Sequence, residues 1–220
     1  MKTTAIKNST FGLYATLIFA FMGFSPPDAV SPISQPKKAT GQIPEVAFQN
    51  GEKLTYKIYY NLNFIWVPAG EVTFKIFDEV NQYHYQAVGE TYDSYEWFFS
   101  AKDKYDSWAD KNTLLPNYSE RSVNEGNYHI FEKITFNQSA RKMTVWRAPK
   151  RGDAEEKTEH IVKTDCHDVL SSLYNLRNFD YGSQQAGYVV PFSIFMDKAE
   201  YPLKMNYMGK DDNKKLYKMG

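Results

Sequence analysis

The chain has 220 residues, enough for one domain with a substantial core, and its 26 basic residues equal its 26 acidic residues in number. A net charge of zero gives no electrostatic reason to expect nucleic acid or a strongly anionic membrane surface as a partner. Aromatic residues make up 16% of the chain, with 17 Tyr and 15 Phe, which suits the half-buried surfaces of β-sheets.

Residues 1–30 have the pattern of a secretory signal peptide. Lys2 and Lys7 give a positive start, and an uncharged apolar run from Phe11 to Phe24 follows before two prolines end it. The run is shorter than the about 20 residues that span a bilayer, so we expect cleavage of this segment rather than a membrane anchor. This predicts a periplasmic or otherwise exported protein, cut after residue 20 and before residue 35, with no transmembrane span in the mature chain.

The remainder of the chain divides into a linker and one domain. Residues 31–47 hold several prolines and few large apolar side chains, which is typical of a linker. Residues 48–220 are predicted to form a β domain. The apolar pattern is still running where the sequence stops, and such a break leaves a sheet edge open, so we expect further C-terminal strands after residue 220.

Within this domain, apolar and polar side chains alternate with a period of two, as in strands with one buried side. The segments with this alternation are residues 54–60, 71–80, 83–91, 104–108, 128–136, 141–148, 188–195 and 201–207. Short polar turns between the first three predict a meander, and Pro68 and Gly70 predict a turn or a bulge. Residues 114–127 indicate a strand edge and a long turn, and residues 148–160 a charged loop without core residues.

One strand holds a charge that breaks its apolar face. Glu132 interrupts the set of Ile130, Ile134 and Phe136, so the opposite set around Phe131 is expected to face the core.

The period changes over about residues 167–179. Apolar side chains recur there at spacings of three and four, which predicts an amphipathic helix with Leu173 at the centre of its apolar stripe. Asp165 or Asp168 is expected as the N-cap, and Arg177 suits the last turn because a cation stabilises the helix dipole there. We therefore predict a mainly β fold: a single curved antiparallel sheet or half-barrel with one amphipathic helix packed on it.

Two segments carry a resemblance to a known family. They are F-x-x-G-E-x-L-x-Y-x-I-x-Y from Phe48, followed by A-G-E-V-T-F, and DCHDVLSSLYNLRNFDYGSQQAG from Asp165. In order and spacing they resemble the exported bacterial family known as domain of unknown function 3108, over about Phe48 to Gly209. The resemblance implies curved antiparallel strands around a helix, similar in outline to periplasmic lipoprotein carriers, and further strands after residue 220. That family has no agreed activity, so no catalytic residue is transferred from it.

The densest set of possible ligand or catalytic groups is His160, Asp165, Cys166, His167 and Asp168. Cysteine and histidine bind zinc, and carboxylates can complete such a site, but adjacent Cys166 and His167 at a helix start make a poor chelate. Nothing in the sequence places a distant histidine beside the thiol as a base. We therefore expect no catalytic site, no metal and no cofactor. A hydrolase or metal protein using Cys166 and His167 stays as the second alternative.

Aromatic clusters interrupt the alternation at two places. Trp66 lies between two strand patterns, and Tyr95, Trp97 and Phe98 lie in a segment of uncertain structure. Aromatics between strands often line a binding mouth, although they can also plug the open end of a half-barrel, because most aromatics are buried. We predict Trp66, Tyr95, Trp97 and Phe98 as ligand-binding residues.

The leading functional hypothesis is a non-enzymatic binding or carrier-like domain for an apolar or amphiphilic ligand, such as a lipid or a segment of an envelope protein. The first alternative is a structural or interaction module that pairs through an open sheet edge. An apolar cavity would favour the carrier, and a filled core with a free edge would favour the module.

Overall fold

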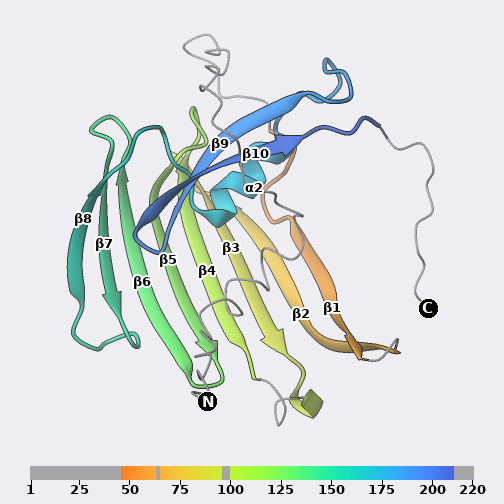
Figure 1. Ribbon diagram of the computed structural model, residues 1–220, viewed down its shortest axis with the longest axis vertical. Coiled ribbons are helices and arrows are strands. Elements are labelled where there is room, and N and C mark those ends of the chain that lie inside the picture. The colour runs from red at the N-terminus through yellow and green to blue at the C-terminus, as the bar shows by residue number, and fades with distance from the viewer. Residues whose placement is uncertain (1–45, 63–64, 96–99, 211–220) are drawn as a thin grey trace, which may run out of the picture.

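The computed structural model describes residues 46–62, 65–95 and 100–210, and an eight-stranded antiparallel sheet is its largest element (Figure 1). The strands are β1 (Lys53–Leu62), β2 (Ile65–Asp78), β3 (Gln82–Thr91), β4 (Lys102–Asp110), β5 (Pro116–Glu125), β6 (Tyr128–Asn137), β7 (Lys142–Ala148) and β8 (Glu156–Ile161). Each strand pairs with the next one along the chain. In the described part of the chain β1 and β8 are therefore the two edges, and the sheet is not closed.

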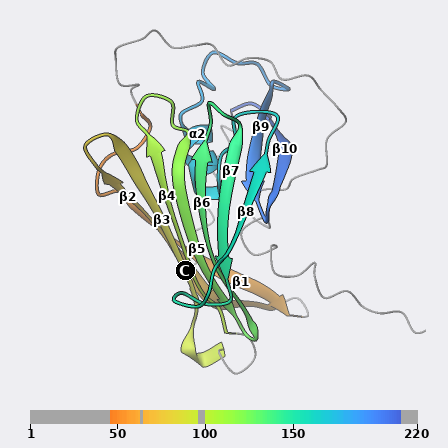
Figure 2. The same ribbon diagram turned by 90° about the vertical axis from the view of Figure 1, so that its left-hand side faces the viewer.

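One face of this sheet is covered by the segment that follows β8. Helix α2 (Val169–Arg177) packs on β3 and β4, and strand β9 (Val189–Met196) packs against the helix. Strand β10 (Ala199–Asn206) pairs with β9 alone, and both lie on the same side of the large sheet as α2 (Figure 2). We call this side the covered face and the other the open face. The arrangement confirms the predicted mainly β fold with an amphipathic helix on an open antiparallel sheet.

Asp168 is the N-cap of α2, which decides between the two predicted candidates. Its Oδ1 accepts the backbone N–H of Leu170 at 2.8 Å and of Ser171 at 3.2 Å, and the Ser171 hydroxyl accepts the Asp168 N–H at 3.0 Å. This reciprocal pair is a capping box. At the other end Arg177 donates to Glu52, the residue before β1, at 2.6 Å, which fixes the helix against the sheet.

The apolar stripe of α2 is shifted from its predicted centre. Leu170 is 2% exposed and packs with Tyr174 against the side chains of β3, whereas Leu173 is only half-buried. The stack of Tyr174 on Tyr85, with ring centroids 4.1 Å apart, sets which side of the helix faces the sheet. The expectation that Leu173 is central is therefore wrong, because the sheet contacts the helix through the Leu170–Tyr174 side.

Two predicted irregular segments are strands. Residues 116–125 form β5 because their polar side chains find partners on neighbouring strands, and Pro116 stands at the first position, where a missing N–H is tolerated. Residues 156–161 form β8, an edge strand whose charged residues suit a side exposed to water. The predicted bulge is present: Ile58 pairs with Gly70 and Tyr59 with Pro68, so Ala69 is the extra residue.

The predicted inner face of β6 is also corrected. Ile130, Ile134 and Phe136 are buried, and Glu132 on the same side is 1% exposed because it is ion-paired with two arginines. Phe131 is buried as well, under Arg151 and Lys133 on the open face.

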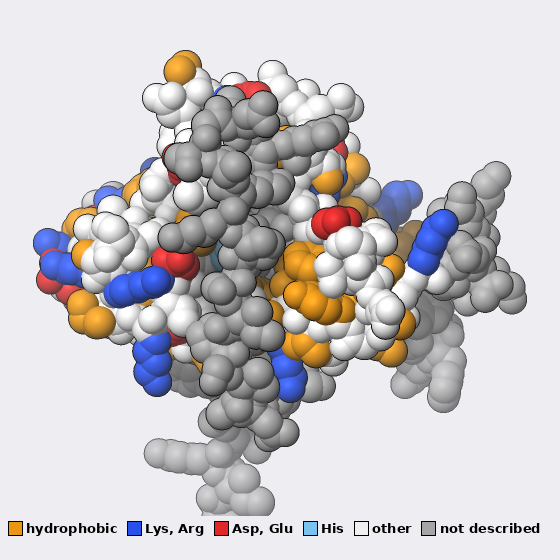
Figure 3. All heavy atoms as spheres, turned by 90° about the horizontal axis from the view of Figure 1, so that it is seen from above, with side chains coloured by type: hydrophobic (Ala, Val, Ile, Leu, Met, Phe, Trp, Pro, Cys, Tyr) orange, Lys and Arg blue, Asp and Glu red, His pale blue; other side chains and the backbone are white. Residues whose placement is uncertain are grey.

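Seen from above, hydrophobic side chains gather most densely to the right of the centre, smaller hydrophobic groups lie elsewhere on this face, and charged side chains are spread among them (Figure 3). No helix among the described residues is long and apolar enough to cross a membrane.

Two terminal segments, residues 1–45 and 211–220, lie outside the described residues. The first of them includes the predicted signal peptide and most of the predicted linker.

Candidate ligand-binding site

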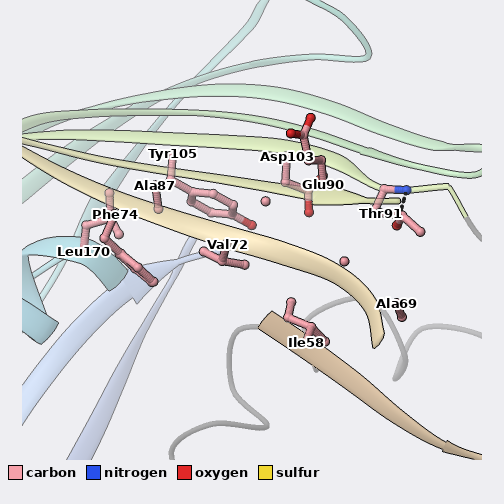
Figure 4. A pocket seen from close by; sticks show the side chains of 13 residues that line it. Ile58, Ala69, Val72, Phe74, Ala87, Glu90, Thr91, Asp103, Tyr105 and Leu170 are labelled. Atoms are coloured by element: carbon pink, nitrogen blue, oxygen red, sulfur yellow. Dashed lines mark hydrogen bonds between the residues drawn. The ribbon is translucent and has the colours of Figure 1, made fainter. Parts of the chain in front are cut away.

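The covered face contains a hollow of about 50 Å³ beside Leu170 of α2, where strands β1 to β4 lie side by side (Figure 4). Its lining is mainly small or apolar. The lining residues are Ile58, Ala69, Gly70, Val72, Phe74, Ala87, Gly89, Glu90, Thr91, Ala101, Asp103, Tyr105 and Leu170. Five of these are Gly or Ala, and their small size leaves space between the larger side chains of the lining.

The glycines in the lining have different roles. A side chain on Gly70 would place its Cβ 2.4 Å from the backbone oxygen of Glu90, so glycine is required there for the close approach of β2 and β3. A Cβ on Gly89 would lie 3.2 Å from Cγ2 of Val72, a tight contact with a side chain rather than with backbone. Gly89 is therefore the position at which a substitution would fill the hollow without breaking the sheet.

The hollow has one polar end. Asp103 lines it, and its carboxyl group shares a hydrogen bond with that of Glu125 at the end of β5. Glu125 is 3% exposed, and its Oε2 has no hydrogen-bond partner among the described residues. Burial, with the neighbouring Asp103 charge, raises the pKa of Glu125 to about 7, and burial also raises the pKa of Asp103 against the pull of the Asn124 N–H at 2.8 Å. Two carboxyl groups this close resist ionising together, so they retain a proton near neutral pH.

Tyr105 lies between this polar end and the apolar part of the hollow (Figure 4). Burial raises the pKa of its hydroxyl, which therefore stays protonated as a neutral group. Beyond it, Arg121 interacts with Tyr105 and donates to Glu132 at 2.9 Å. The covered face thus changes from an apolar hollow to a line of polar groups across β4, β5 and β6.

The aromatic residues predicted as ligand contacts do not line this hollow where the structure describes them. Tyr95 is half-buried in the short 3₁₀ helix η2 (Asp93–Tyr95), away from the lining. Trp66 belongs to β2 and pairs with Asn61, but its side chain lies outside the described residues, as do Trp97 and Phe98. A binding role for these residues stays a prediction.

The hollow itself was missed because sequence reasoning looked for large aromatic side chains. The signal that could have found it is the run of small residues at inward positions of neighbouring strands, such as Gly70, Ala87, Gly89 and Ala101. Glu125 gave no signal either, because a charged residue beside a glycine turn is usually exposed.

The set around Cys166 does not come together as a reactive centre in the described part of the chain. Cys166 is fully buried, and burial raises the pKa of its thiol to about 12, so the thiol is protonated at neutral pH. Burial lowers the pKa of His167 to about 4, which leaves a neutral imidazole. Asp165 pairs with Arg141, Asp168 caps α2, and no three His, Cys, Asp or Glu side chains among the described residues converge as metal ligands.

Comparison with known proteins gives a family and no activity. Residues 55–220, well over half of the chain, match the family described as protein of unknown function (DUF3108). No curated protein and no solved structure matches the chain.

Proposed function

Since the chain belongs to the DUF3108 family, whose description assigns no activity, we propose from its geometry that the domain is a non-enzymatic binding protein. Its hollow on the covered face takes the end of an apolar or amphiphilic ligand. The observation that carries this proposal is the hollow itself: small residues on neighbouring strands leave space beside Val72, Phe74 and Leu170, where an ordinary core would be filled.

The size of the hollow limits what it encloses. About 50 Å³ is far below the roughly 300–1,000 Å³ of pockets that enclose a whole small molecule. Only the end of an alkyl chain or one apolar side chain fits inside, and the rest of the ligand lies along the mouth. A lipid tail and an apolar segment of an envelope protein both meet this requirement.

The compartment is part of the proposal. The charged and then apolar start of the sequence supports export to the periplasm, where a protein of this kind would meet both classes of ligand. An alternative role as a module that pairs through a sheet edge has less support at the edge formed by β8. Strand β8 carries Glu156, Lys157 and Glu159 along one edge, and charges of this kind oppose pairing with a further strand.

The test is a titration with octanol, followed through the methyl signals of Ile, Leu and Val in ¹H–¹³C spectra of the purified domain. Octanol is expected to shift the signals of Ile58, Val72 and Leu170 in the parent protein. Gly89→Leu fills the hollow and is expected to abolish these shifts.

The matched control is Val88→Leu, one residue away on the opposite face of β3. It adds bulk outside the hollow, and octanol should bind this variant as it binds the parent. Thermal unfolding checks that both variants are folded. Equal octanol shifts in the parent and in a folded Gly89→Leu variant would show that the hollow is not the binding site.

A further inference from the structure

We propose that the Asp103–Glu125 carboxyl pair recognises the polar end of the ligand, and that this end is an amine, so that the hollow selects a cationic amphiphile over a carboxylate with the same chain. The inference rests on the proposed function and adds the chemical class of the ligand to it.

The first support is an acceptor without a donor. Glu125 is 3% exposed, yet its Oε2 has no hydrogen-bond partner among the described residues. A buried carboxyl oxygen in this state costs free energy unless a donor reaches it. Asp103 lines the hollow and shares a hydrogen bond with Glu125, so a ligand there lies next to Asp103, with Glu125 directly behind it.

The second support is the charge around the pair. Arg121 is the cation whose charge reaches Asp103, but its guanidinium is already bound to Glu132 at 2.9 Å and to Asp197 at 2.5 Å. The pKa of Glu125 is raised by burial and by the neighbouring Asp103, and no cation is among the main causes of the shift. The polar end of the hollow is therefore acidic and only partly compensated.

The third support is the placement of apolar and polar groups in one line. Phe74 and Leu170 lie at the apolar end of the hollow, and Tyr105 separates them from Asp103 (Figure 4). An alkylamine matches this order, since its chain contacts the apolar end while its ammonium group donates to the carboxyl oxygens. Charge-assisted hydrogen bonds of this kind are about twice as strong as neutral ones. An alkyl carboxylate would place a like charge against the pair and lose affinity.

The experiment compares octylamine, octanol and octanoate, each titrated below its micelle concentration and near neutral pH, with the methyl signals of the hollow as the readout. In the parent protein, octylamine is expected to bind at least about tenfold more tightly than octanoate, with octanol between them. Asp103→Asn and Glu125→Gln are expected to remove most of the preference for octylamine over octanoate. Asp153→Asn, which removes one exposed charge far from the hollow in sequence, should leave the order unchanged.

The outcomes separate the two proposals. If octanol binds at the hollow but octylamine binds no more tightly than octanoate, the carboxyl pair does not select an amine, and the proposed binding function stands. If none of the three probes shifts the methyl signals, both proposals are wrong. The ranking in the parent protein is sufficient for this decision even where a carboxyl variant unfolds.

Discussion

The carboxylate of Glu132, in the middle of β6, accepts a hydrogen bond from Nε of Arg121 on β5 at 2.9 Å. Arg147 on β7 donates to the other oxygen of Glu132 at 2.6 Å, and both arginines also bind Asp197. Asp197 lies in the turn between β9 and β10, so the network fastens that hairpin to the large sheet. Since Glu132 is 1% exposed, its charge is tolerated only because two guanidinium groups compensate it.

Glu132→Ala is expected to lower the free energy of unfolding by about 3–5 kcal/mol, because it leaves two partly buried arginines with only Asp197 as a shared partner. Denaturant unfolding followed by circular dichroism measures the change. Glu156→Ala is the control, since Glu156 pairs with Lys198 at an exposed position, where an ion pair contributes at most about 1 kcal/mol. A loss below about 1 kcal/mol for Glu132→Ala would show that the network does not hold the fold together.

This network also shows where sequence reasoning stops. Alternation along β6 predicts a strand, but a glutamate at an inward position is ambiguous until the partner arginines are known. Those partners come from β5 and β7, and their pairing depends on the register of three strands. The strand could therefore be predicted from the local pattern. Which of its two sides is buried depends on tertiary contacts with β5 and β7.

The distinction between local pattern and tertiary contacts also explains which other elements could be predicted from the sequence and which could not. Helix α2 was predictable because Val169, Leu173 and Leu176 recur at spacings of four and three, which is a local signal. Strand β8 was missed because its sequence is almost entirely polar, and only its place at the sheet edge makes that stable. The hollow was missed because it forms where small residues on neighbouring strands lie next to one another. Which residues become neighbours depends on the register of the strands.

The contact side of α2 is tested by two parallel substitutions. Leu170→Asp is expected to unfold the domain or to lower its stability by several kcal/mol, because Leu170 is 2% exposed and an aspartate there would be buried without a partner. Leu173→Asp is expected to cost clearly less, because Leu173 is half-buried and its carboxylate can reach water. Thermal melts of both variants give the comparison. A larger loss for Leu173→Asp would place the helix in a different rotation on the sheet.

Cys166 is expected to resist thiol reagents in the folded protein and to react on unfolding. Its side chain is fully buried, and its raised pKa keeps it as the less reactive thiol. The rate of labelling by a colorimetric disulfide reagent, with and without denaturant, measures this. Cys166→Ser is also expected to leave octanol binding intact, because Cys166 does not line the hollow. Rapid labelling of the native protein would revive a reactive role for this residue.

The buried carboxyl of Glu125 predicts how stability depends on pH. Its pKa is about 7 in the folded protein and near 4.5 in an unfolded chain, so between these values the folded state keeps a proton that the unfolded state releases. Raising the pH through this window therefore favours unfolding: the contribution of Glu125 is fully present below about pH 4.5 and is lost as the pH rises through about 7.

The loss is at most roughly 3–4 kcal/mol, since about 2.5 pH units separate the two values and each unit corresponds to about 1.4 kcal/mol. Denaturant unfolding of the parent and of Glu125→Gln at about pH 5 and about pH 8 tests this, because the amide cannot titrate and should remove most of the decrease. Asp153→Asn should keep the decrease, since Asp153 is exposed and its charge is solvated. The same decrease in Glu125→Gln as in the parent would mean that other groups cause it and that Glu125 is not held in its protonated form. Octylamine provides a second test, because an amine that binds the carboxyl pair favours the ionised form of the pair. Octylamine should therefore offset part of the decrease in stability near pH 8. Octanol should change the free energy of unfolding equally at both pH values.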